Sequence, residues 1–143
     1  MAAEPTLIYL VKQVELALRS NLDELLRPAG ITPWQYAALT VLERTVDLSA
    51  AELARYSFVT AQTVADLVTA LEYRGLITRH RDPRNRRRLA IELTDEGRRL
   101  LDDYRGPVAE IEARMVDGLA PDEVEAFRRY LNLSRSALAV AQR

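Results

Sequence analysis

Hydrophobic residues recur at helical spacing on both sides of a more polar middle segment. Over residues 6–27 they follow one another three or four positions apart, and Pro28 and Gly30 end the pattern. The same spacing recurs over residues 94–117 and 121–142. The pattern therefore predicts a long first helix and two long final helices.

The middle segment predicts three shorter helices, each opened by a hydroxyl residue that can cap its first turn. Thr32 and Ser49 each stand three positions before a Gln or Glu, which is the pattern of a capping box. Thr60 precedes an apolar stripe that ends near Arg74. We expect helices over about 33–44, 50–56 and 61–74, with a short turn at 57–59.

The period of the pattern then changes from helical to alternating. Gly75 ends the third short helix, and alternation over 76–79 and 89–93 predicts two strands of a hairpin. Its tip, residues 82–86, combines turn formers with arginine. We therefore predict a mainly α (α+β) fold that contains a winged helix-turn-helix over about 33–93.

Composition indicates a globular protein and removes several classes of chemistry. The 143 residues are 48% hydrophobic and 29% charged, as is usual for a folded soluble chain. No apolar run approaches a membrane span and the first residues lack the pattern of a signal peptide, so we expect a cytoplasmic protein without membrane contact. There is no cysteine, and His80 is the single histidine, so we expect no metal site and no cofactor.

The distribution of charge matters more than its sum. The formal net charge of -1 argues against a nucleic-acid partner. Residues 72–88, however, hold seven arginines and two acids, a local balance of +5. Such a segment suits a surface that contacts phosphates, although a charge run can also be a solvated face.

Four segments form a pattern that can be compared with known families: LSAAELA (48–54), LEYRGLITR (71–79), DPRNRR (82–87) and LTDEG (93–97). Together they resemble the MarR family of bacterial transcriptional regulators, and the resemblance covers nearly the whole chain. It implies one MarR-like domain over 1–143 that forms a homodimer through helices 6–27 and 94–142. Two winged units would then bind successive turns of a pseudo-palindromic duplex, about 10 base pairs apart. The apolar content of the outer helices supports dimerisation, but they could instead complete a monomeric core.

The third short helix is expected to enter the major groove. Gln62 and Thr63 stand in its first turn, where they can reach base edges, and Thr69 lies on the same polar face. Thr60 can donate to a phosphate, although N-capping alone also explains it. The alternative for Gln62 and Thr63 is that they are simply exposed to solvent. Asp66 departs from the family pattern, because relatives often carry arginine there.

The hairpin tip is expected to reach the minor groove. Arg84 stands where the family inserts an arginine, and the flat guanidinium suits a narrow, negative groove. Arg86 is the second candidate, and Asp82 is expected to support the tip by pairing with Arg84 or Arg86. Three further arginines are phosphate contacts or solvated: Arg81, Arg87 and Arg88. Asn85 departs from a second aspartate that is common in relatives.

The resemblance also implies regulation by a small aromatic or anionic effector. Tyr9, Trp34 and Tyr36 are candidates to line its pocket, although aromatic residues at helical spacing are more often core. Effector binding would shift the balance between dimers that fit DNA and dimers that do not.

Two other classes of function compete with DNA binding. An enzyme is not expected, because the chain lacks a glycine-rich phosphate loop, a Ser-His-Asp set beyond one histidine, and clustered ligands. The stronger rival is a winged-helix module that binds a protein and does not read DNA. Salt separates the two, because phosphate binding weakens steeply with ionic strength and an apolar interface does not.

Overall fold

The computed structural model describes residues 3–57 and 60–141. The chain divides into two compact units, and the boundary along the sequence falls between Ile111 and Glu112. Residues 58–59 of the expected turn and residue 142 of the expected last helix lie outside the described residues.

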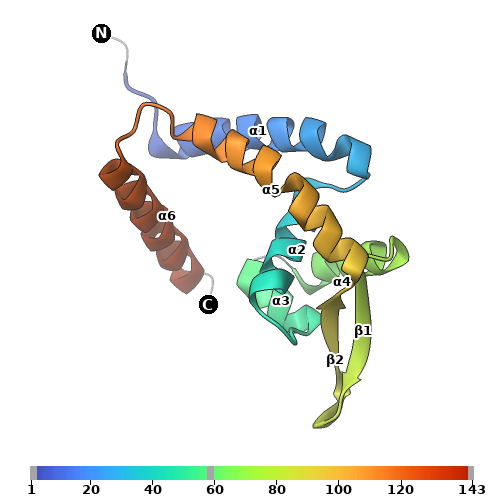
Figure 1. The fold of residues 1–143 in the computed structure, drawn as a ribbon. Helices are drawn as coiled ribbons and strands as arrows, with labels where there is room; N and C mark the ends of the chain where they lie inside the picture. The colour runs from blue at the N-terminus through green and yellow to red at the C-terminus, as the bar shows by residue number, and fades with distance from the viewer. Residues whose placement is uncertain (1–2, 58–59, 142–143) are drawn as a thin grey trace. The chain divides into compact units, whose positions relative to one another are not determined.

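The first unit has the order of elements that defines a winged helix (Figure 1). Its α5 continues into the second unit. Every helix predicted from the hydrophobic pattern is present, with ends within about two residues of those expected. The elements are α1 (Leu7–Leu26), the 3-10 turn η1 (Arg27–Ala29), α2 (Pro33–Arg44), α3 (Ala50–Ser57), α4 (Ala61–Tyr73), β1 (Ile77–Asp82), β2 (Asn85–Leu93) and α5 (Asp95–Met115).

Local capping explains where the helices begin. The Thr32 hydroxyl accepts from the Gln35 amide at 3.2 Å, and the Gln35 side chain accepts from the Thr32 amide at 2.9 Å, so the predicted capping box is formed. Ser49 and Glu52 make the same exchange at the start of α3, at 3.2 Å in each direction. These bonds satisfy amides that a helix start leaves unpaired.

The hairpin is longer than the sequence predicted. β1 and β2 pair in antiparallel register from Ile77 opposite Leu93 to Arg81 opposite Leu89, and the register then shifts so that Asp82 faces Asn85. Apolar alternation ends where the strands leave the core, so the outer part of the hairpin carries no hydrophobic signal. The Ile91 amide also donates to the Leu48 carbonyl at 2.8 Å, which ties β2 to the segment before α3.

The core of the first unit lies between α2, α3, α4, the base of the hairpin and the start of α5. Its largest fully buried side chains are Leu26, Leu39, Leu53, Leu71, Ile77, Ile91 and Leu101. Gly97 in the first turn of α5 lies so close to the Leu76 carbonyl that a Cβ would collide with it. The Thr94 hydroxyl donates to the Gly75 carbonyl at 2.7 Å and accepts from the Gly97 amide at 3.1 Å. The LTDEG segment thus joins the end of β2 to the end of α4.

The second unit contains the end of α5 and α6 (Pro121–Ala141), whose first turn carries Asp122 and Glu123. The Glu123 side chain accepts from the Ala120 amide at 2.8 Å and so caps this helix. The exposed large hydrophobic residues on the described part of α6 are Tyr130, Leu131, Leu133 and Leu138. Within the described residues, no helix has both the length and the apolar character needed to cross a membrane.

Candidate nucleic-acid interface

α4 packs one face into the core and leaves a polar face in solvent. Val64, Val68 and Leu71 are buried, whereas the four predicted contact residues Thr60, Gln62, Thr63 and Thr69 are all exposed. The structure therefore places all four at exposed positions of α4 and its N-cap. Whether they contact DNA stays a prediction.

The first turns of α4 are ordered by their own side chains. Thr60 caps the helix by accepting from the Thr63 amide at 3.1 Å, and the two hydroxyl oxygens lie 2.9 Å apart. Gln62 Nε2 donates to Asp66 Oδ1 at 3.0 Å. The helix carries no lysine or arginine over 61–73, so positive charge has to come from elsewhere.

The hairpin tip is held by side chains that bond to its own backbone. Asp82 Oδ1 accepts from the Arg84 amide at 2.8 Å, and Asn85 Oδ1 accepts from the Arg87 amide at 3.2 Å. Arg81 Nη1 donates to the Arg86 carbonyl at 2.7 Å. The hydrogen bond from the Arg84 amide lowers the pKa of the Asp82 carboxyl below its usual value, and the charge and hydrogen bond of Arg88 lower it further. The tip is thus an ordered turn despite its lack of apolar residues.

The ion pair of Asp82 differs from the one expected. Its Oδ2 lies 3.1 Å from Nη1 of Arg88, and this is the ion pair of Asp82 within 4 Å, instead of one with Arg84 or Arg86 as predicted; the charge of Arg84 acts on Asp82 only as the last of the causes that lower its pKa. In the tight turn, Oδ1 of Asp82 accepts from the Arg84 amide. Oδ2 is therefore left to accept from Arg88, which lies on β2.

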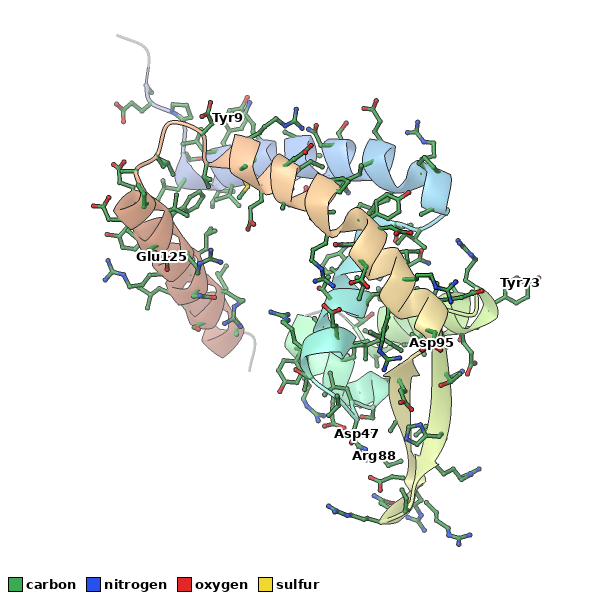
Figure 2. All side chains as sticks on the ribbon, viewed as in Figure 1. Tyr9, Asp47, Tyr73, Arg88, Asp95 and Glu125 are labelled. Carbon is green, nitrogen blue, oxygen red and sulfur yellow. The ribbon has the colours of Figure 1, made fainter. Side chains whose placement is uncertain are left out.

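Arg88 reaches beyond the wing to the helix-turn-helix. Its Nε and Nη2 lie 3.0 and 2.5 Å from Glu52 Oε1, and Nη2 also donates to the Asp47 carbonyl (Figure 2). Hydrogen bonds from Arg88 and from Ser49 lower the pKa of Glu52 to about 2. Sequence reasoning missed this contact, because nothing in the pattern connects two residues 36 positions apart.

The contacts divide the seven arginines of 72–88 into two groups. Four donate to protein acceptors: Arg74 to the carbonyls of Gly30 and Ala29, Arg79 to Glu72, Arg81 to the Arg86 carbonyl, and Arg88 as above. Within the described part of the chain, the guanidinium groups of Arg84, Arg86 and Arg87 make no hydrogen bond or ion pair, and all three residues are exposed. These three cations are available to an external anion.

The three aromatic candidates for an effector pocket have different surroundings. Tyr9 on α1 is exposed and its hydroxyl accepts from Gln13 at 3.0 Å, and Trp34 on α2 is exposed as well. Tyr36 packs against the core, and burial raises the pKa of its hydroxyl. The pocket stays a prediction.

His80 lies on the wing, with Nδ1 3.7 Å from Glu92 Oε2. Over residues 3–57 and 60–141, no group of three or more His, Cys, Asp or Glu side chains is placed to hold a metal ion.

Comparison with known proteins agrees with this architecture. Residues 29–88 match the MarR family. A curated HTH-type transcriptional repressor of Mycobacterium tuberculosis is 31% identical over 92% of this chain and 94% of its own length. MepR of S. aureus, solved as a complex with DNA, superposes with a TM-score of 0.85 at 28% identity, over 94% of this chain and 99% of that one. CouR of Rhodococcus jostii, solved with p-coumaroyl-CoA, superposes with a TM-score of 0.79 at 28% identity, over 86% of this chain and 87% of that one.

The winged-helix order of elements, the polar α4 and the arginine-tipped hairpin define a DNA-binding transcriptional regulator of the bacterial winged-helix class. The relatives are regulators and not enzymes. Within that class, this chain belongs to the MarR family.

Proposed function

We propose that this protein is a cytoplasmic repressor, without enzymatic activity, that binds a pseudo-palindromic duplex as a homodimer. The whole chain acts as one functional domain. α4 enters the major groove with Thr60, Gln62, Thr63 and Thr69, and the wing places Arg84 in the adjacent minor groove with Arg86 beside it. Asp82 supports the wing by holding the amide of Arg84.

The observation that carries the proposal is the division of the wing arginines. An ion pair with an acid of the same chain would neutralise an arginine. Among the described residues, Arg84, Arg86 and Arg87 have no such pair. Clustered at the end of an ordered turn, they give a strong local positive charge on a chain with a net charge of -1. That arrangement favours a polyanion as partner over an apolar protein surface.

Homodimerisation is supported by the outer helices. Leu26 is the only residue of α1 that is buried, and the helix exposes a run of large hydrophobic side chains: Leu7, Ile8, Tyr9, Leu10, Val11, Val14 and Leu16. A soluble chain rarely leaves such a contiguous apolar surface uncovered. α6 also exposes hydrophobic residues, and a second copy of the chain would cover both in a two-fold arrangement.

The test is binding to duplexes from the upstream region of the protein's own gene, followed by fluorescence anisotropy over a range of salt. We expect tight, salt-sensitive binding that Arg84→Ala weakens by about 1–3 kcal/mol for each half-site, the size of a groove contact. Arg99→Ala is the matched control, because it removes the same charge from an exposed position on α5. Binding no tighter than to random duplex, across several genomic fragments, would favour the protein-interaction module instead.

Regulation by a small aromatic, anionic effector is the remaining part of the proposal. Its support is that CouR has been solved with an aromatic acyl-CoA and that Tyr9 and Trp34 are exposed. Trp34 is the single tryptophan, so its fluorescence reports on binding nearby. Aromatic carboxylates and aromatic acyl-CoA thioesters should quench it and release the operator. A panel that does neither would argue against this site.

A further inference from the structure

Arg88 joins three parts of the first unit that are distant in sequence. It lies on β2, contacts Asp82 at the wing tip at 3.1 Å, and contacts Glu52 in the first turn of α3 at 3.0 and 2.5 Å. A fourth bond reaches the carbonyl of Asp47, in the turn between α2 and α3. One side chain therefore links the wing to the helix-turn-helix.

The same contacts remove Arg88 from the set of DNA ligands. Each of its three nitrogens already donates within the protein, and two carboxylates surround its charge. Its side chain is 25% exposed, whereas Arg84, Arg86 and Arg87 are exposed and without such bonds within the described residues. These bonds commit four of its five N–H groups and leave one, on Nη1, so a phosphate could make at most a single bond to Arg88 without displacing Glu52 or Asp82.

A wing needs such a connection because a two-stranded hairpin is marginally stable by itself. Near its base, the hairpin is tied down by the bond between the Ile91 amide and the Leu48 carbonyl. Farther out, Arg88 carries the connection from Glu52 to Asp82, whose other oxygen holds the amide of Arg84. The path from α3 to the wing tip is thus continuous through side-chain bonds.

We propose that Arg88 is the positioning residue that fixes the wing relative to the helix-turn-helix, so that Arg84 and α4 engage neighbouring grooves together. This inference rests on the proposed function. Arg88 binds no DNA in this arrangement and acts through Arg84. Glu52 is its anchor, although that residue is negative and the proposed partner is a polyanion.

The sign of one effect separates positioning from simple electrostatics. Glu52→Gln removes a negative charge and keeps the capping box, in which Gln is as suitable as Glu. Electrostatics alone predicts tighter DNA binding by this variant. Positioning predicts weaker binding, because the charge-assisted bonds to Arg88 are lost. We expect operator affinity to fall several-fold in Glu52→Gln and about tenfold or more in Arg88→Met.

A double-mutant cycle with Arg84→Ala provides the second readout. If Arg88 acts through Arg84, the loss caused by Arg84→Ala shrinks in the Arg88→Met background. The slope of the logarithm of affinity against the logarithm of salt concentration should be the same for Arg88→Met and the unchanged protein, because no phosphate contact is removed. Additive losses, with a slope reduced by about 0.9 for each half-site, would show that Arg88 contacts phosphate and would overturn the inference.

A measurement without DNA keeps the two proposals distinguishable. The chain has no cysteine, so Arg86→Cys accepts a single nitroxide at the wing tip, at an exposed side chain that makes no hydrogen bond or ion pair among the described residues. Electron paramagnetic resonance should show a more mobile tip with Arg88→Met than without it, and circular dichroism checks that both variants are folded. An equally ordered tip would overturn the inference while operator binding stands. Absence of specific binding by the unchanged protein would overturn the proposed function and, with it, this role of Arg88.

Discussion

At the scale of single residues, the partner of a charged side chain decides what that side chain can do. Arg105 on α5 lies 2.9 Å from Glu43 and 3.0 Å from Asp102, and Arg79 lies 2.8 Å from Glu72. Exposed pairs of this kind each contribute little to stability. They do neutralise arginines that would otherwise spread positive charge over the protein. Arg84, Arg86 and Arg87, which make no such pair among the described residues, lie together at the wing tip.

Asp66 is the one acid on α4 that faces solvent near Gln62. Asp66→Asn keeps a partner for Gln62 and removes a negative charge, so we expect affinity for random duplex to rise a few-fold at low salt. The gain should disappear as salt increases. Asp103→Asn on α5 is the control with the same charge change. An equal gain in both variants would mean that Asp66 has no particular proximity to DNA.

The pKa of Glu52 predicts a response to acid. Folding lowers this pKa from 4.5 to about 2, chiefly through the hydrogen bond from Arg88. The stabilisation is complete above pH 4.5 and is lost as pH falls from 4.5 toward 2. Urea unfolding midpoints should therefore fall less over this interval in Glu52→Gln than in the unchanged protein. Parallel pH curves for the two proteins would contradict the ion pair.

At the scale of elements, local chemistry was readable from sequence and long-range pairing was not. Thr32, Ser49 and Thr60 open helices where their spacing predicted, because capping involves residues three positions apart. Periodicity also identified the buried face of α4. It could not show which acid meets Arg88 or that Arg74 would bond to the last carbonyl of η1 and to that of the Gly30 C-cap, since such contacts depend on the assembled fold.

Gly97 tests the packing of α5 against the end of α4. Gly97→Ala places a methyl group against the Leu76 carbonyl and 3.3 Å from the Leu93 side chain. We expect a loss of about 1–3 kcal/mol in the free energy of unfolding, measured with urea. Gly106→Ala is the matched control in the same helix, because nothing lies within 4 Å of the added Cβ. That variant should gain about 0.5–1 kcal/mol from helix propensity, and a similar loss in both would refute the steric explanation.

At the scale of the whole molecule, a basic wing and an acidic remainder together give a net charge near zero. The wing segment 72–88 carries +5, so the rest of the chain carries -6 against a total of -1. α1 and α6 expose hydrophobic side chains, whereas the tip of the hairpin exposes arginine. Because an acidic remainder repels DNA, we expect the wing to supply most of the attraction to phosphates and the apolar helices to serve a protein partner.

A substitution on α1 tests whether that partner is a second copy of the chain. Val11 is 61% exposed on α1, and Val46, in the turn after α2, is 76% exposed. Val11→Glu would bury a charge in a dimer interface and should shift sedimentation equilibrium toward monomer, whereas Val46→Glu should not. Because each monomer carries a single wing, operator binding by Val11→Glu should also weaken and depend more steeply on protein concentration. If both variants remain dimers with unchanged affinity, α1 lies outside the interface and its exposed hydrophobic residues need another explanation.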